Sequence, residues 1–248
     1  MVIIIFILGL FIGSFLNVCI SRIPLEESIA YPPSHCTSCS AHLKPWDLVP
    51  LLSYIYLGGR CRYCKTKISV EYPLAEIITG LIFAVLYIKF GFSFYLFKYL
   101  IFTALAVVIA AIDYKYQLIY QSTTIAAFTA GIAIIILEKI IYSQNVTNYF
   151  FGALSAALII SIIVYVTKGM GTGDIEIAAY AGLFLGFPLS LLMIALSFVI
   201  GGGIAVILLL LKIRDKKDPI AFGPYLLLSA FLCILWGKDF LLWYFLLF

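Results

Sequence analysis

Two aspartates could do chemistry in this chain, and both stand at the ends of long apolar runs. Asp113 occurs in the stretch Ala-Ala-Ile-Asp-Tyr, and Asp174 occurs in the stretch Gly-Met-Gly-Thr-Gly-Asp. A carboxylate beside hydrocarbon is costly, so an acid at a membrane edge is a functional candidate. Two carboxyls within hydrogen-bond reach share one proton, and such a pair can activate water against a peptide carbonyl. The two residues therefore predict the catalytic pair of an aspartyl protease that works at the bilayer.

Glycines precede the second aspartate. Gly171 and Gly173 remove side chains beside Asp174, so we expect a substrate backbone to approach it closely. The competing interpretation is that each aspartate only caps a helix end, because Asp is a favourable N-cap residue just before an apolar run. Glu76 and Glu176 are further candidates for structural partners or substrate contacts.

Four cysteines form two Cys-x-x-Cys pairs, Cys36 with Cys39 and Cys61 with Cys64. This spacing is typical of a zinc site in which four thiolates complete a tetrahedron around one ion. Zn²⁺ would also organise a polar segment that is too short to build its own core. The alternative is two disulfides, which a cytoplasmic location disfavours because thiols stay reduced there.

The composition places these residues in a membrane protein. Of the 248 residues 64% are hydrophobic and 11% are charged, whereas soluble domains carry about a quarter charged residues. We therefore expect an all-α polytopic membrane protein of about eight transmembrane helices. The apolar runs predict spans at 2–20, 73–90, 94–112, 123–142, 148–167, 175–187, 188–211 and 222–247.

The distribution of lysine and arginine orients these spans. Twelve of the sixteen basic residues fall on one side of the predicted map, which the positive-inside rule makes cytoplasmic. Both aspartates fall on that side, since two complete spans separate them. We predict three parts: a first transmembrane helix at 1–20, a cytoplasmic tetracysteine zinc module at 21–72 and a transmembrane peptidase bundle at 73–248.

Small residues recur at a spacing of four in two of the spans. Gly9 and Gly13 form one such pair, and Gly182 and Gly186 form the other. This spacing is typical of helix faces that pack closely.

Several stretches in combination resemble the type IV prepilin peptidases, which are leader peptidases and N-methyltransferases of the GxGD-type aspartyl proteases. The resemblance covers nearly the whole chain. It rests on the aspartate and cysteine motifs and on the stretches 13–18, 22–24, 52–54, 68–69, 71–76, 79–80 and 222–225.

This resemblance implies a function, a location and partners. The family removes a short basic leader from type IV prepilins, pseudopilins and competence pilins at the cytoplasmic face of the bacterial inner membrane. Its members usually methylate the new N-terminus with S-adenosylmethionine. Asp113 and Asp174 match the family's catalytic aspartates, and the four cysteines match its zinc module. The expected partners are pilin precursors and the lipid bilayer, and not nucleic acid.

Two alternatives stay open at this point. The chain could be a peptidase that no longer methylates, because no residue set marks a pocket for S-adenosylmethionine. It could also be a non-enzymatic membrane scaffold, in which the zinc module binds a partner and the aspartates only cap helices.

Overall fold

The computed structural model describes residues 1–143, 145–213 and 220–247, and in this part of the chain every regular element is a helix. The all-α prediction is therefore confirmed. Three of the basic residues that oriented the predicted spans, Arg214, Lys216 and Lys217, lie outside the described residues. Contacts between residues divide the chain into two units, Met1–Val108 and Ile109–Phe248.

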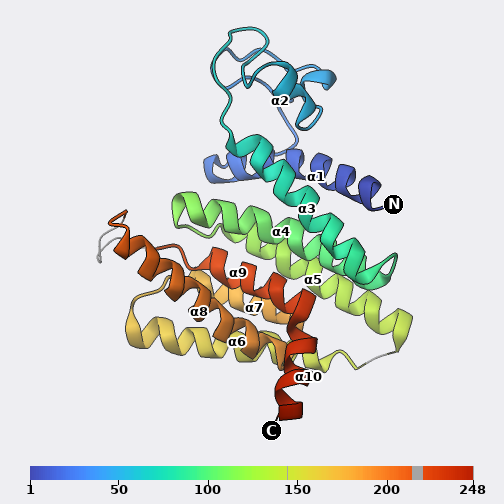
Figure 1. Ribbon diagram of the computed structural model, residues 1–248, viewed down its shortest axis with the longest axis vertical. Helices are drawn as coiled ribbons and strands as arrows, with labels where there is room; N and C mark the ends of the chain where they lie inside the picture. Colours follow the sequence, from blue (N-terminus) through green and yellow to red (C-terminus); the bar gives the residue numbers. More distant parts are fainter. Residues whose placement is uncertain (144, 214–219, 248) are drawn as a thin grey trace. The chain divides into compact units, whose positions relative to one another are not determined.

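The first unit consists of two long helices, the beginning of a third and the tetracysteine segment. Figure 1 shows this segment as the loops around α2, inserted between α1 and α3. The elements in chain order are α1 (Val2–Arg22), η1 (Ile23–Leu25), η2 (Pro45–Asp47), α2 (Leu52–Tyr56), α3 (Glu71–Phe90) and α4 (Phe94–Tyr116), which continues into the second unit.

Glycines allow α1 and α3 to pack backbone against backbone. A Cβ atom at Gly9 would lie 2.7 Å from the Cα of Gly80, and one at Gly13 would lie 2.8 Å from the Cα of Glu76. The close-packing face predicted for Gly9 and Gly13 is confirmed. It brings the buried carboxyl group of Glu76 to the interface between the two helices.

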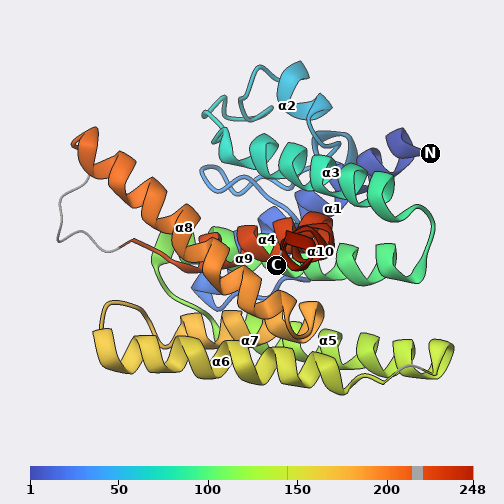
Figure 2. The same ribbon diagram turned by 60° about the horizontal axis from the view of Figure 1, so that its bottom comes forward.

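The second unit is a bundle built around one short, buried helix. Four residues of α7 (Gly173–Leu185) have no exposed surface, namely Ile177, Ala178, Tyr180 and Ala181. Figure 2 shows the other helices of this unit that follow α4. They are α5 (Gln121–Tyr142), α6 (Thr147–Thr167), α8 (Leu189–Leu210), α9 (Gly223–Leu232), the π-helical turn η3 (Cys233–Gly237) and α10 (Lys238–Leu247).

The contact between α6 and α7 also depends on glycine. A Cβ atom at Gly152 would lie 2.6 Å from the carbonyl oxygen of Gly182 and from the Cα of Gly186, and Gly186 approaches Asn148. The small-residue face predicted for Gly182 and Gly186 is thereby confirmed. Because position 182 meets 152 and position 186 meets 148, the two helices run antiparallel.

Within the described residues, seven helices are long and apolar enough to cross a bilayer, so the protein is a multi-pass membrane protein. They are Val2–Leu25, Glu71–Phe90, Phe94–Tyr116, Gln121–Tyr142, Thr147–Thr167, Leu189–Leu210 and Gly223–Leu246.

The span predicted at 175–187 is the exception. It forms the 13-residue helix α7, whose length of about 20 Å falls short of a hydrocarbon core of about 30 Å. Gly186 with φ of +74° and Pro188 end the helix after Leu185. Its apolar residues are explained by burial among neighbouring helices, not by contact with lipid along a full span.

Candidate active site and metal centre

The two aspartates lie at neighbouring helix ends within the second unit. Asp113 stands in the last turn of α4, and its residue exposure is 5%. Asp174 is the second residue of α7, and its exposure is 6%. The N-cap of α7 is Thr172, so Asp174 is not the capping residue of that helix.

Electrostatics connect the two carboxyl groups. Burial and, to a smaller extent, the charge of Asp113 raise the pKa of Asp174 to about 7. One contact opposes this shift: the backbone N–H of Gly171 donates a hydrogen bond of 3.1 Å to Asp174 Oδ2. Asp174 lies outside the seven spans. The folded chain therefore brings two acids, sixty-one residues apart in sequence, into range of each other's charge.

A third element, the start of α9, completes this site. A Cβ atom at Gly223 would lie 2.5 Å from Asp113 Oδ2 and 2.6 Å from Cδ1 of Ile177, a residue one turn beyond Asp174. Asp113 Oδ2 is buried, and within the described residues it makes no hydrogen bond of normal geometry. The α4, α7 and α9 helices thus converge on the pair of acids.

The glycines around Asp174 differ in what surrounds them. A Cβ atom at Gly171 would have only Asp174 near it, at 3.9 Å from Oδ2. A Cβ atom at Gly173 would meet the side chain of Ile119, including its Cβ at 2.9 Å. Space beside the acid is therefore open at position 171, whereas Ile119 fills it at position 173.

Sequence reasoning did not identify Gly223 as a site residue. The stretch Phe222-Gly223-Pro224-Tyr225 contributed only to the resemblance to a family, and it predicted no role for Gly223. Its position beside Asp113 depends on how α9 packs against α4 and α7, and no local pattern encodes that packing.

The four cysteines of the two Cys-x-x-Cys pairs come together in the first unit. Their sulfur atoms all lie within 4.8 Å of one another, and Sγ of Cys36 lies 3.8 Å from Sγ of Cys64. A tetrahedral zinc site with bonds of about 2.3 Å requires sulfur atoms about 3.8 Å apart. All four are recorded as free cysteines. The donor set therefore fits one tetrahedral metal ion.

The two cysteine turns have the same backbone hydrogen bonds. Cys36 N–H donates to the carbonyl of Ala41 at 3.0 Å, and Ser40 N–H donates to that of Cys36 at 2.8 Å. In the second turn Cys61 and Lys65 make the equivalent bonds, at 2.9 and 3.0 Å. Ser40 and Lys65, each directly after the second cysteine of a pair, both adopt positive φ. Each turn thus presents its two thiols on one side.

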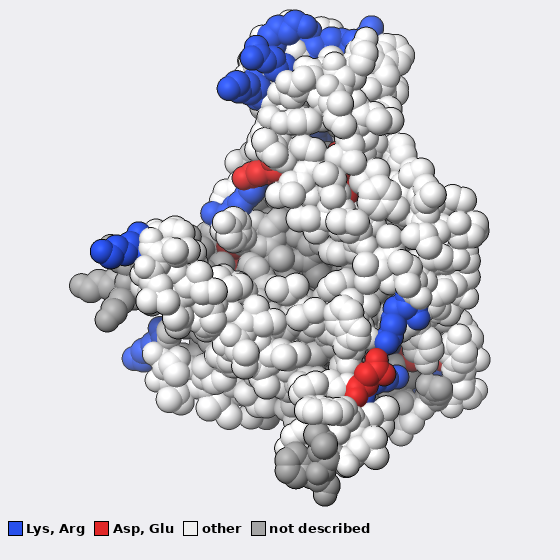
Figure 3. Space-filling view, viewed as in Figure 1, with Lys and Arg blue, Asp and Glu red and all other residues white. Residues whose placement is uncertain are grey.

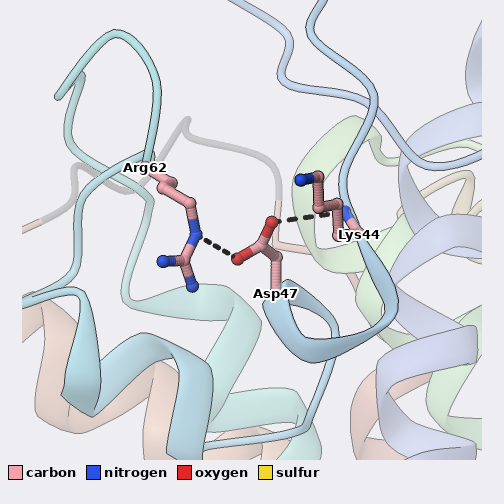
Figure 4. Close-up of polar contacts among 3 residues, drawn as sticks. All are labelled: Lys44, Asp47 and Arg62. Atoms are coloured by element: carbon pink, nitrogen blue, oxygen red, sulfur yellow. Dashed lines mark hydrogen bonds and ion pairs between the residues drawn. The ribbon is translucent and has the colours of Figure 1, made fainter.

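An ion pair joins the second cysteine turn to the segment that follows the first. Arg62 Nε donates to Asp47 Oδ1 at 2.7 Å, and the backbone N–H of Lys44 donates to Asp47 Oδ2 at 3.2 Å (Figure 4). The Asp47 side chain is 2% exposed, so both of its oxygens are bound away from water. This contact joins the second cysteine turn to the segment that follows the first.

Two family models match the chain. A model of the bacterial peptidase A24 N-terminal domain matches residues 7–90, and a model of the type IV leader peptidase family matches residues 100–206. The first match includes all four clustered cysteines, and the second includes both aspartates.

Curated relatives match most of the chain. A protein of Bacillus subtilis is 32% identical over 97% of this chain and 96% of its own length. A protein of Pseudomonas aeruginosa is 30% identical over 94% and 89%, and one of Myxococcus xanthus is 36% identical over 83% and 62%. Each of these relatives is named a prepilin leader peptidase/N-methyltransferase. No solved structure matches the chain.

Proposed function

Because the chain belongs to the type IV leader peptidase family, we propose that it is a membrane aspartyl endopeptidase acting on prepilins. It cleaves the basic leader peptide and then N-methylates the new N-terminal residue. The observation that carries the proposal is the buried pair of Asp113 and Asp174, in which burial and, as a smaller cause, the charge of Asp113 raise the pKa of Asp174 to about 7.

The roles of the two acids depend on which of them is protonated at neutral pH. At neutral pH we assign the shared proton to Asp174, whose pKa is raised, and the negative charge to Asp113. The Asp113 carboxylate takes a proton from water as the water oxygen attacks the scissile carbonyl carbon. Asp174 gives its proton to the carbonyl oxygen, which produces a neutral tetrahedral intermediate.

Collapse of that intermediate restores the pair. The carbonyl forms again, its hydroxyl proton returns to Asp174, and the proton held by Asp113 passes to the leaving amine. Gly171 leaves open space beside Asp174, where we place the approaching substrate backbone. Gly173 keeps its predicted role in substrate approach only through the backbone, because Ile119 occupies its side-chain space.

We place the reaction at the cytoplasmic face of the bacterial inner membrane. The asymmetric distribution of lysine and arginine supports this orientation. The substrates on this view are type IV prepilins, pseudopilins or competence pilin precursors. We retain the functional division into a first helix at 1–20, a zinc module at 21–72 and a peptidase bundle at 73–248.

We assign Zn²⁺ to Cys36, Cys39, Cys61 and Cys64 as a structural ion. The sulfur geometry supports it, and the ion would hold together a segment with little core of its own. The methyl donor is S-adenosylmethionine, as the N-methyltransferase names of the relatives suggest. We assign no residues to its binding.

Co-expression with a candidate prepilin, followed by mass analysis of the pilin N-terminus, tests both activities. The expected product begins directly after the leader and carries one added methyl group. A processed but unmethylated N-terminus would show that the protein is a peptidase without methyltransferase activity. An intact leader with every candidate prepilin would contradict the proposal.

A further inference from the structure

The segment between the two cysteine pairs exposes large apolar side chains. In residues 46–56 the exposed fraction is 56% for Trp46, 67% for Leu52, 73% for Ile55 and 81% for Tyr56. Contiguous apolar surface of this kind marks contact with a partner or a membrane. This exposed apolar surface therefore indicates contact with a membrane or a partner.

This segment lies against the middle of a membrane-spanning helix. An apolar groove of about 240 Å³ separates the two, lined by Ile7, Leu10 and Phe11 of α1 and by residues 49–52. Leu10 precedes Arg22, the basic residue in the last turn of α1, by twelve residues, or about 18 Å along a helix. Half of the hydrocarbon core is about 15 Å, so the groove lies at acyl-chain depth.

Two backbone N–H groups of the segment have partners within the protein. Leu51, the N-cap of α2, has φ of +59°, and its N–H donates to Glu76 Oε2 at 2.9 Å. Leu52 N–H donates to the carbonyl of Pro50 at 2.6 Å. In hydrocarbon every backbone polar group needs a partner from the protein. Glu76, itself buried between α3 and α1, supplies an acceptor that water would supply to a soluble loop.

Apart from Asp47, which is paired with Arg62, the charged side chains of the module lie outside residues 46–56. Arg60, Lys65 and Lys67 of the second cysteine turn are exposed, whereas Asp47 is the one acid in residues 33–70 and is bound to Arg62. Figure 3 shows lysine and arginine side chains gathered at the tip of the module. The module is thus amphipathic, with apolar residues beside α1 and basic residues away from it.

We propose that residues 46–56 form a re-entrant element that lies in the acyl-chain layer, with Glu76 as its anchor and a phospholipid acyl chain in the groove against α1. Lipid is the occupant because the groove lining is entirely apolar and continues the exposed apolar surface of α1, which includes Ile3, Ile4 and Leu8. The inference goes beyond peptidase and methyltransferase activity, because it concerns how the module is held at the membrane.

Tryptophan fluorescence in bilayers that contain brominated phospholipids tests the depth of this element. The native tryptophans are first replaced in Trp46→Phe, Trp236→Phe and Trp243→Phe, and Ile55→Trp then reports from α2. Bromines in the middle of the acyl chain should quench this probe several-fold more than aqueous iodide does. The matched probe Lys67→Trp, in the exposed second cysteine turn, should show the reverse pattern.

Two results would overturn the proposal. One is a tryptophan at position 55 that iodide quenches and brominated lipid does not. The other is protection from iodide only after a prepilin is added, which would make the groove a surface for substrate. Zinc content of each variant, measured in parallel, identifies a protein in which the module has unfolded.

The anchoring role of Glu76 has its own variants. Glu76→Gln keeps an oxygen that accepts from Leu51 N–H, so lipid quenching at position 55 should stay as in the parent. Glu76→Ala removes the acceptor, and the probe should move toward water, with weaker lipid quenching and faster amide exchange at Leu51. Equal quenching and equal exchange in both variants would refute the anchor.

Discussion

Gly223 lies so close to Asp113 that a methyl group at position 223 would stand 2.5 Å from Asp113 Oδ2. The same methyl group would stand 2.6 Å from Cδ1 of Ile177 on α7. The first residue of α9 therefore limits where the Asp113 carboxyl group can be. Only glycine allows the three helices to meet at this point.

Gly223→Ala is expected to lower kcat/KM for leader cleavage by roughly 10²-fold, since small displacements of a catalytic group have effects of this size. Asp113 must turn aside, or α9 must shift, to admit the methyl group. The matched control is Gly203→Ala, because a Cβ atom at Gly203 meets nothing within 4 Å. Equal cleavage by both variants in a reconstituted assay would show that the close approach does not matter.

Asp113→Asn and Asp174→Asn should each lower cleavage by at least about 10²-fold, because an amide neither accepts nor donates the transferred proton. The amide oxygen at position 174 can still accept the hydrogen bond from Gly171 N–H. The thermal unfolding midpoint measured in detergent serves as the control for folding. Normal leader removal by either variant would contradict the catalytic role of the substituted aspartate.

Cleavage should decline as pH rises above about 7. In that range Asp174, whose pKa is raised to about 7 by burial and by Asp113, loses the proton that it gives to the carbonyl oxygen. A pH profile of kcat/KM in lipid nanodiscs measures this decline in cleavage. A profile that stays flat from pH 7 to about pH 9 would remove Asp174 as the proton donor.

Stability should depend on pH through the same residue. The folded protein binds the Asp174 proton more tightly than the unfolded chain does, where the pKa is near its ordinary value of 3.8. Asp174 therefore contributes most to the free energy of unfolding below that value, and the contribution is lost as pH rises to about 7. Asp174→Asn should abolish this dependence, which unfolding measurements across the pH range would detect.

Purified protein should contain about one zinc ion per chain. Cys36→Ser and Cys61→Ser should each lose most of it, because each removes one of four ligands from the cluster. Cys19→Ala is the matched control, since Cys19 is buried in α1 and is not part of the cluster. Metal analysis by mass spectrometry and titration of free thiols provide the readouts. A zinc-free protein with two intact disulfides would refute the site.

Gly152→Ala should lower the free energy of unfolding by about 1 to 3 kcal/mol, the usual cost of an overpacked interface. Its methyl group would stand 2.6 Å from backbone atoms of both Gly182 and Gly186, and backbone yields less readily than a side chain. Gly202→Ala, with nothing within 4 Å of its Cβ position, should be tolerated. Equal unfolding midpoints for the two variants would contradict close packing of α6 on α7.

Local patterns were sufficient for several features of this protein. The glycine pairs of α1 and α7 predicted contacts that the structure confirms at Gly80 and Gly152. The spacing of the cysteines predicted one four-thiol cluster, and the sulfur atoms lie together. These features could be predicted from the sequence for two reasons. Helix periodicity relates residues that are only a few positions apart, and the cysteine spacing matches a known set of metal ligands.

The short helix α7 shows the limit of that reasoning. Its apolar residues have the composition of a lipid-facing span, yet Gly186 and Pro188 end it after 13 residues and its neighbours bury it. Composition alone does not distinguish burial in protein from burial in lipid, because both environments exclude water. The length of the helix distinguishes the two environments, because 13 residues are too few to cross a bilayer.

The sequence by itself determined that this chain is a helical membrane protein with two acids at the ends of apolar runs and four thiols spaced for one metal ion. Hydropathy, charge and local spacing carry that information, because each depends on residue type and short-range geometry. The tertiary structure alone decided that Gly223 of α9 lies against Asp113, that Ile119 fills the space at Gly173, and that Glu76 binds the backbone of Leu51. Such contacts join residues that are distant in sequence, and they depend on how whole helices pack.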